Sequence, residues 1–222
     1  MIEIDKKEVI RYLGYRGIGE PDEKLNNLID ECIKELQEKA TPRSVYKTFP
    51  INHHVTMENV SDDAIEFAGI TVSSGNLLKN LKGCSEIVML AVTIGPAPDM
   101  LVRRSEVRDI MKAYTYQAAG AAMVEAWCDE INNKIVEEAK ARELYARPRF
   151  SPGYGDFPLE VQKDFERILE MPKTIGVTLS ESLLMTPTKS VTAVIGLSDI
   201  DMACHKGGCE ECTMHETCEY SR

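Results

Sequence analysis

The sequence "RFSPGYGDFP" at residues 149–158 suits neither a helix nor a strand. Pro152 fixes its own φ angle and restricts the residue before it, while Gly153 allows a turn or a close approach of the backbone. A loop stiffened in this way would hold Arg149 and Tyr154 in fixed directions. We expect Arg149 to bind a carboxylate through paired hydrogen bonds and Tyr154 to lie on a flat ligand. The residue types alone also allow a rigid connector, with Arg149 in a surface ion pair and Tyr154 covering the core.

Helical patterns of apolar residues lie on both sides of this loop. They predict helices over 5–15, 20–40 and 74–83, one long helical region over about 97–145, and a helix over 158–171. The long region contains Gly120 inside an alanine-rich block. Glycine costs a helix about 1 kcal/mol relative to alanine, so we interpret Gly120 as a position where another element packs closely.

Stretches rich in β-branched and aromatic residues predict the strands. They fall at 43–51, 53–60, 64–72, 84–95, 174–182 and 190–197. Helices, strands, helices and strands therefore follow one another in blocks rather than in a regular β-α-β alternation. This order predicts an α+β fold, a mostly antiparallel sheet with long helices packed on it. We expect a single domain over 1–200, followed by a cysteine-rich tail over 201–222.

The composition excludes some classes of partner. The 222 residues include 26 Lys and Arg against 36 Asp and Glu, a formal net charge of −10. Nucleic acids and anionic membranes attract positive surfaces, so we expect neither as a partner. The longest apolar run, "IVMLAV" at 87–92, has the length of a strand rather than of a membrane span. The N-terminus lacks a signal-peptide pattern, and we therefore expect a cytoplasmic protein.

Two motifs and one helix resemble a known family. The pattern Arg-x-x-x-Gly-Tyr, formed by Arg149, Gly153 and Tyr154, resembles the signature loop of the activation domain of vitamin B12-dependent methionine synthase. The segment "TLSESLLMTPTKSV" at 178–191 is similar to that family's Thr/Ser-Glu-Ser-x-x-Met-x-Pro-x-x-Ser-Val segment. The stretch "GAAMVEAWCDEINNKI" resembles its long Ala- and Glu-rich helix. Together the similar stretches cover roughly 108–196.

The resemblance implies a function for the loop. In this family the domain binds S-adenosylmethionine and caps a cobalamin carrier whose cobalt has oxidised to Co(II). One electron from a flavodoxin-type donor and a methyl group from S-adenosylmethionine then restore methylcobalamin. By the same resemblance Arg149 would contact the ligand, Gly153, Tyr154 and the backbone near Ser151 would help to hold it, and Glu125 would match the helix glutamate. A sulfonium ligand with an aminoacyl tail suits such a mixture of carboxylate, cation and backbone groups.

Other modules of a methionine synthase are missing from the sequence. It contains no Asp-x-His-x-x-Gly motif, whose histidine ligates cobalt in the cobalamin-carrying module. We therefore expect a subunit of a methyltransferase that is not active alone. Its expected partners are a cobalamin-binding methionine synthase subunit or another corrinoid protein, and a flavodoxin-like or ferredoxin-like electron donor.

Two other functions remain open from the sequence. A non-catalytic binding module could dock on a corrinoid protein and cap it. The stretch "SVTAVIGLSDIDMAC" at 190–204 favours this alternative, because it has no aromatic residue where the family carries tyrosines near its ligand. An iron–sulfur electron-transfer accessory is the third alternative, and it depends on the C-terminal cysteines alone.

The C-terminal tail has the spacing of a metal site. Cys204, Cys209, Cys212 and Cys218 form a Cys-x4-Cys-x2-Cys-x5-Cys pattern within fifteen residues. Four thiolates suit tetrahedral zinc or an iron–sulfur cluster, and the spacing does not separate the two. Zinc would make the tail a structural clasp, whereas a cluster would supply an electron relay to cobalt. A reduced tail without metal is the remaining possibility.

Overall fold

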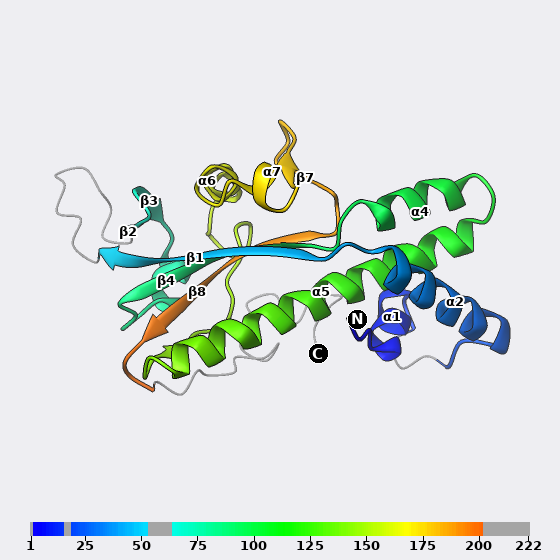
Figure 1. Ribbon diagram of the computed structural model, residues 1–222, viewed down its shortest axis with the longest axis horizontal. Helices are drawn as coiled ribbons and strands as arrows, with labels where there is room; N and C mark the ends of the chain where they lie inside the picture. The colour runs from blue at the N-terminus through cyan, green and yellow to red at the C-terminus, as the bar shows by residue number, and fades with distance from the viewer. Residues whose placement is uncertain (1, 16–18, 53–63, 202–222) are drawn as a thin grey trace.

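The computed structural model describes residues 2–15, 19–52 and 64–201, and its centre is a six-stranded antiparallel sheet (Figure 1). The strand order is β3-β2-β1-β4-β8-β5. The strands are β1 Arg43–Asn52, β2 Ala64–Phe67, β3 Ile70–Ser73, β4 Glu86–Thr93, β5 Tyr145–Ala146 and β8 Ser190–Ser198. Each neighbouring pair is antiparallel. The predicted α+β fold with a mostly antiparallel sheet is therefore confirmed.

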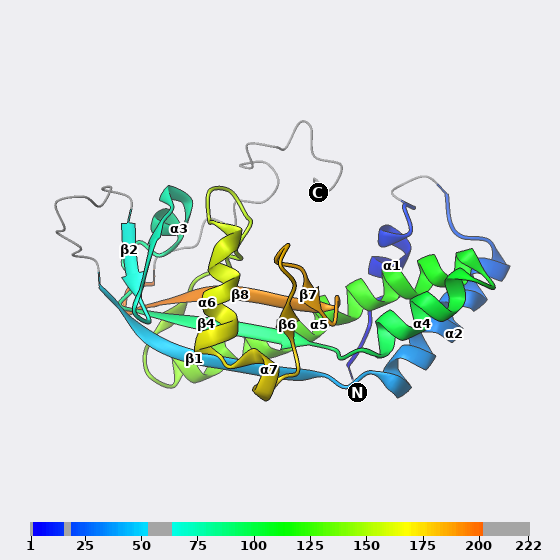
Figure 2. The ribbon, with the colours of Figure 1, turned by 90° about the horizontal axis from the view of Figure 1, so that it is seen from above.

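Helices cover both faces of this sheet. They are α1 Lys6–Tyr12, α2 Glu23–Lys39, α3 Gly75–Asn80, α4 Ala97–Glu106, α5 Ile110–Lys140, α6 Gln162–Ile168 and α7 Met171–Thr174. The long helix α5 runs along one face, and α1, α2 and α4 gather around its N-terminal half, while α6 and α7 lie on the opposite face (Figures 1 and 2). Among the described residues, no helix combines the length and the apolar character needed to cross a bilayer.

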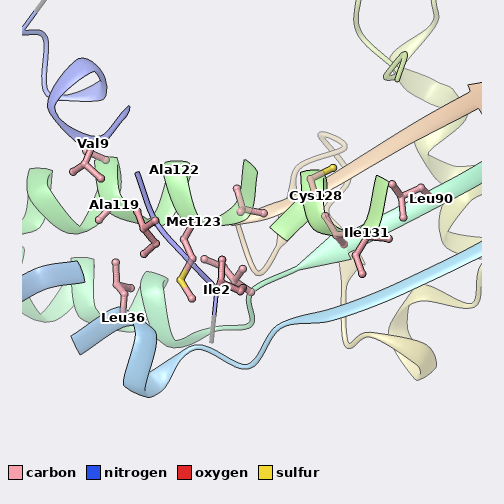
Figure 3. Close-up of a cluster of buried hydrophobic side chains, with 14 of the residues drawn as sticks. Ile2, Val9, Leu36, Leu90, Ala119, Ala122, Met123, Cys128 and Ile131 are labelled. Atoms are coloured by element: carbon pink, nitrogen blue, oxygen red, sulfur yellow. The ribbon is translucent and has the colours of Figure 1, made fainter. Parts of the chain in front are cut away.

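The central strand β4 is buried on both faces, which explains its unbroken apolar sequence. Because side chains alternate along a strand, Val88 and Leu90 pack toward α5, where Leu90 lies beside Ile131 (Figure 3). Ile87 and Met89 pack on the other face, beneath α3, α6 and α7. The sheet thus separates two apolar clusters.

Gly120 was interpreted as a position where another part of the chain packs closely on α5, and Lys189 does so. A Cβ atom at this position of α5 would lie 3.1 Å from Cε of Lys189, in the segment that leads into β8. The aliphatic stem of Lys189 therefore packs on the backbone of α5, and the close approach is confirmed.

The prediction of one long helical region over 97–145 is wrong in two places. The region contains two helices, because Asp109 has extended backbone and its side chain accepts a hydrogen bond from Lys112 N at 3.0 Å, which begins α5. The helix then ends at Lys140, and β5 follows at Tyr145–Ala146. The apolar spacing continues across Asp109, so the spacing alone did not reveal that Asp109 is the N-cap of a second helix.

Three smaller differences concern the other predicted elements. The strand expected over 174–182 is reduced to β6 Thr178–Leu179, which pairs with β7 Met185–Thr186 in a separate two-stranded sheet. The helix expected over 158–171 begins with the 3-10 turn Leu159–Val161 and ends with α6 at Ile168, and Glu170, whose φ of 51° is left-handed, precedes the separate helix α7. The strand expected over 64–72 is the β2–β3 hairpin. The strand expected at 53–60 lies outside the described residues.

Candidate ligand-binding site

The candidate site lies at the edge of the sheet, where the chain separates from β8. After β5 the backbone follows β8, with hydrogen bonds from Arg147 N to Gly196 O at 2.8 Å and from Phe150 N to Val194 O at 3.0 Å. Phe150 forms a bridge with Val194, and the loop 151–158 follows it. A cavity of about 450 Å³ lies between this loop, α5, α6 and the first residues of β8. Its lining includes Arg149, Ser151, Tyr154, Gln162, Ser190 and Thr192.

The loop is rigid because its turns are closed by backbone hydrogen bonds. Gly153 N donates to Phe157 O at 2.8 Å, Tyr154 N to Ser151 O at 3.1 Å and Phe157 N to Tyr154 O at 3.0 Å. The first of these turns needs a φ of 93° at Gly153, which favours glycine. The rings of Phe150 and Phe157 stack with their centroids 5.9 Å apart. The stiffness expected from the prolines and glycines is therefore present.

Asp156 fastens the same loop to α3. Its carboxylate accepts hydrogen bonds from the hydroxyl of Ser74, from Gly75 N at 2.8 Å and from Asn76 N at 3.2 Å. The hydrogen bond from Ser74, followed by those from the two amides, lowers the pKa of Asp156. The neighbouring Gly155 would place a Cβ atom 2.4 Å from the side-chain amide of Asn76. Loop and helix therefore meet at close range, with the carboxylate satisfying the amides at the start of α3.

Arg149 is held by two carboxylates of α5. One nitrogen, Nη2, lies 2.8 Å from Asp129 Oδ1 and 3.7 Å from Glu125 Oε2. The other, Nη1, is buried and has no hydrogen-bond partner among the described residues. The side chain of Arg149 is only 25% exposed, whereas those of Asp129 and Glu125 are 65% and 51% exposed, so a largely buried cation pairs with two exposed carboxylates. A guanidinium anchored on one side and unsatisfied on the other is suited to bind an anion.

The sequence missed Asp129. A signal for it was available, because Glu125 and Asp129 are four residues apart on α5 and therefore lie on the same face of the helix. With Asp129, the site has two carboxylates beside Arg149, whereas only that of Glu125 was predicted from the sequence.

The predicted binding residues fall into two groups. Glu125, Arg149, Ser151 and Tyr154 line the cavity, whereas Gly153 acts through the backbone turn. Tyr154 is 68% exposed, so it does not cover the core as the rigid-connector alternative required. Its ring is accessible to a ligand, in the arrangement that the loop pattern suggested.

A second hollow of about 920 Å³ lies on the other side of Arg149. Arg149 and Glu125 line both hollows, and Asp5 and Glu8 from the N-terminal segment line the second one. Glu8 is paired with Arg11 at 2.6 Å. Arg149 is therefore the cation shared by the two hollows. The second hollow also has the acidic residues Asp5, Glu8 and Asp129 in its lining.

The thiol of Cys128, a residue of α5 between Glu125 and Asp129, is buried. Burial raises the pKa of Cys128 to about 11, although the guanidinium of Arg149 acts in the opposite direction. Within the described ranges, no group of three or more His, Cys, Asp or Glu side chains is placed to hold a metal ion. The predicted metal ligands Cys204, Cys209, Cys212 and Cys218 lie outside those ranges.

Comparisons with known proteins identify the family and a similar fold. The family model described as "Vitamin B12 dependent methionine synthase, activation domain" matches residues 86–201, which include α5, the loop and β8. The crystal structure of the MetH reactivation domain bound to AdoHcy is similar in fold, with a TM-score of 0.64 at 20% sequence identity. This likeness covers 90% of the present chain and 75% of that chain. No curated protein sequence matches the chain. Because the family model spans more than half of the residues, the chain belongs to the family of vitamin B12 dependent methionine synthase activation domains.

Proposed function

We propose that the protein is a separate activation subunit of a cobalamin-dependent methionine synthase and that the Arg149 cavity binds its methyl donor. The donor is S-adenosylmethionine, and the cobalamin is carried by a partner subunit or by another corrinoid protein. One electron from a flavodoxin-like or ferredoxin-like protein and one methyl group from the sulfonium together convert Co(II) to methylcobalamin and leave S-adenosylhomocysteine. This chain's own residues bind and orient the donor.

The unsatisfied Nη1 atom of Arg149 is the observation that carries the proposal. A buried donor without a partner costs about 1–3 kcal/mol, and a carboxylate at this position would remove that cost. The aminoacyl group of S-adenosylmethionine supplies such a carboxylate. Asp129 fixes the guanidinium beforehand, so the ligand does not have to order it.

The acidic residues beside Arg149 suit the rest of the aminoacyl group. Its ammonium and the sulfonium are both cations, and Glu125 and Asp129 lie next to the expected position of the carboxylate. Opposite charges at such distances stabilise each other most where water is partly excluded. A solved structure with a similar fold was bound to AdoHcy, the product that S-adenosylmethionine leaves after methyl transfer, and this supports the choice of ligand.

Calorimetric titration of the full chain with S-adenosylmethionine and S-adenosylhomocysteine tests the proposal. Arg149→Ala removes the carboxylate's partner, so we expect affinity for both to fall at least tenfold, which is about 1.4 kcal/mol. The control is Arg167→Ala, an exposed arginine paired only with Asp164 on its own helix among the described residues, and it should bind as the wild type does. Absence of binding by the wild type would contradict the proposal and favour a module that caps a corrinoid protein without a methyl donor.

A further inference from the structure

Gln162 lines the same cavity and has a second buried polar atom without a partner among the described residues. It is the first residue of α6 and is only 7% exposed, yet it lines the cavity beside Arg149. Its Oε1 atom is buried and has no hydrogen-bond partner among the described residues. Buried amide oxygens are almost always paired, so this acceptor lacks the partner that its burial calls for.

One unsatisfied atom is a donor and the other is an acceptor, which limits the kinds of ligand that can satisfy both. Arg149 Nη1 requires an acceptor, whereas Gln162 Oε1 requires an N–H or O–H donor. Glu125 and Arg149 line both hollows, but Gln162 lines only the cavity beneath the loop. If the aminoacyl end of the ligand lies beside Arg149, its nucleoside can occupy the cavity that Gln162 also lines.

The shape of the cavity favours the base of that nucleoside over the ribose. Phe150, Pro152, Met185 and Val191 form apolar walls that suit a flat aromatic ring. A glutamine amide also matches the edge of adenine, because its oxygen accepts from the 6-amino group while its nitrogen donates to a ring nitrogen. Ribose hydroxyls offer no such flat, apolar face.

We propose that Gln162 reads the adenine base of the methyl donor through its 6-amino group. This inference rests on the proposed function and adds to it a residue that determines specificity. Gln162 touches the ligand and not the reacting methyl group, so its loss weakens binding and base preference. A site built around an acceptor discriminates against a ligand without the matching donor, because the acceptor then stays unsatisfied.

The test compares S-adenosylhomocysteine with its 6-deamino purine analogue, both titrated calorimetrically into the full chain. We expect the wild type to prefer the adenine compound at least tenfold. Gln162→Leu should lose most of this preference and bind S-adenosylhomocysteine at least tenfold more weakly. Gln117→Leu is the matched control, since Gln117 is an exposed glutamine of α5 that lines a different cavity, and it should change neither value.

Thermal unfolding without ligand separates a binding role from a structural one. Leucine removes an acceptor that has no partner, so the unliganded Gln162→Leu protein should unfold at the same temperature as the wild type or at a higher one. A clear fall would show that Gln162 stabilises the fold and would overturn the inference. Equal affinity of the wild type for both compounds would also overturn it, while leaving the proposed function intact. Failure of the wild type to bind S-adenosylhomocysteine would remove the proposed function and this inference with it.

Discussion

Arg149 combines an anchored and an unsatisfied nitrogen in one guanidinium. Asp129 holds Nη2 at 2.8 Å, and the buried Nη1 has no partner among the described residues. The planar, permanently charged group suits a carboxylate that arrives from the cavity side. At the scale of single residues, the account depends on this asymmetry.

Asp156 positions the loop that carries Arg149, and its effect should depend on pH. Its pKa is lowered in the folded protein, chiefly by the hydrogen bond from Ser74. A carboxyl group of this kind stabilises the fold fully above its unfolded pKa of about 4, and the contribution is lost as pH falls through the lower folded value. Asp156→Asn should weaken S-adenosylhomocysteine binding, because Asp156 holds the loop, and should reduce the loss of stability as pH falls below about 4.

Thermal unfolding of the wild type and Asp156→Asn across this pH range provides the measurement. Glu181→Gln, which changes an exposed carboxylate in the β6–β7 turn, serves as the control. Identical pH profiles of the wild type and Asp156→Asn would show that the contacts of Asp156 with α3 contribute nothing to stability.

Single residues of the site could be predicted from the sequence only in part. Arg149 and Tyr154 were chosen from their places in a proline- and glycine-rich loop, and both line the cavity, whereas their contacts with a ligand stay a prediction. Asp156 and Gln162 were not predicted, because the role of Asp156 depends on its contacts at the start of α3 and that of Gln162 on its burial, and no local pattern contains either. Asp129 was detectable by helical spacing, but nothing in the sequence showed which face of α5 meets the loop.

At the scale of elements, β8 connects the core to the site. Its N-terminal residues line the cavity, whereas Gly196 near its other end lies against the turn that follows α3. A Cβ atom at Gly196 would lie 2.6 Å from Cys84 Sγ and 2.7 Å from Leu81 Cδ2. Both neighbours are buried, so neither can move away at low cost.

Gly196→Ala should therefore lower the free energy of unfolding by about 1–3 kcal/mol, as overpacking of a core does. The matched control is Gly120→Ala, where the added methyl group meets only the flexible stem of Lys189 and gains about 1 kcal/mol of helix propensity. Thermal or urea unfolding measures both. An unchanged stability of Gly196→Ala would contradict the packing described for β8.

The elements themselves were predictable where their signals are local. Capping residues and apolar spacing located α1, α2 and α3, and the continuous apolar run located β4. The break before α5 was missed because Asp109 also fits an uninterrupted helical pattern. The short strands β5, β6 and β7 have two residues each, and their pairing is set by distant parts of the chain.

At the scale of the whole molecule, the N-terminal part illustrates the limit of sequence comparison. The family model begins at residue 86, yet the similarity in fold covers 90% of the chain. The N-terminal segment and α1 contribute Asp5 and Glu8 to the hollow beside Arg149. Neither residue was predicted, because the first 80 residues show no alignable family motif.

The C-terminal cysteines give a prediction for the complete chain. Anaerobically purified protein should contain a metal held by Cys204, Cys209, Cys212 and Cys218, because four closely spaced thiolates suit zinc or an iron–sulfur cluster. A brown colour identifies an iron–sulfur cluster, and a colourless sample with bound zinc identifies a structural zinc site. The double variant Cys209→Ser, Cys212→Ser should lose the metal. A wild type without metal, or a double variant that retains it, would contradict the prediction.

A crystal structure of the full chain with S-adenosylhomocysteine tests the central claim most directly. The account predicts the ligand in the cavity between the loop and β8, with its carboxylate within hydrogen-bond distance of Arg149 Nη1 and its adenine at Gln162. Ligand bound elsewhere on the molecule, or an empty cavity at a saturating concentration of ligand, would contradict the account.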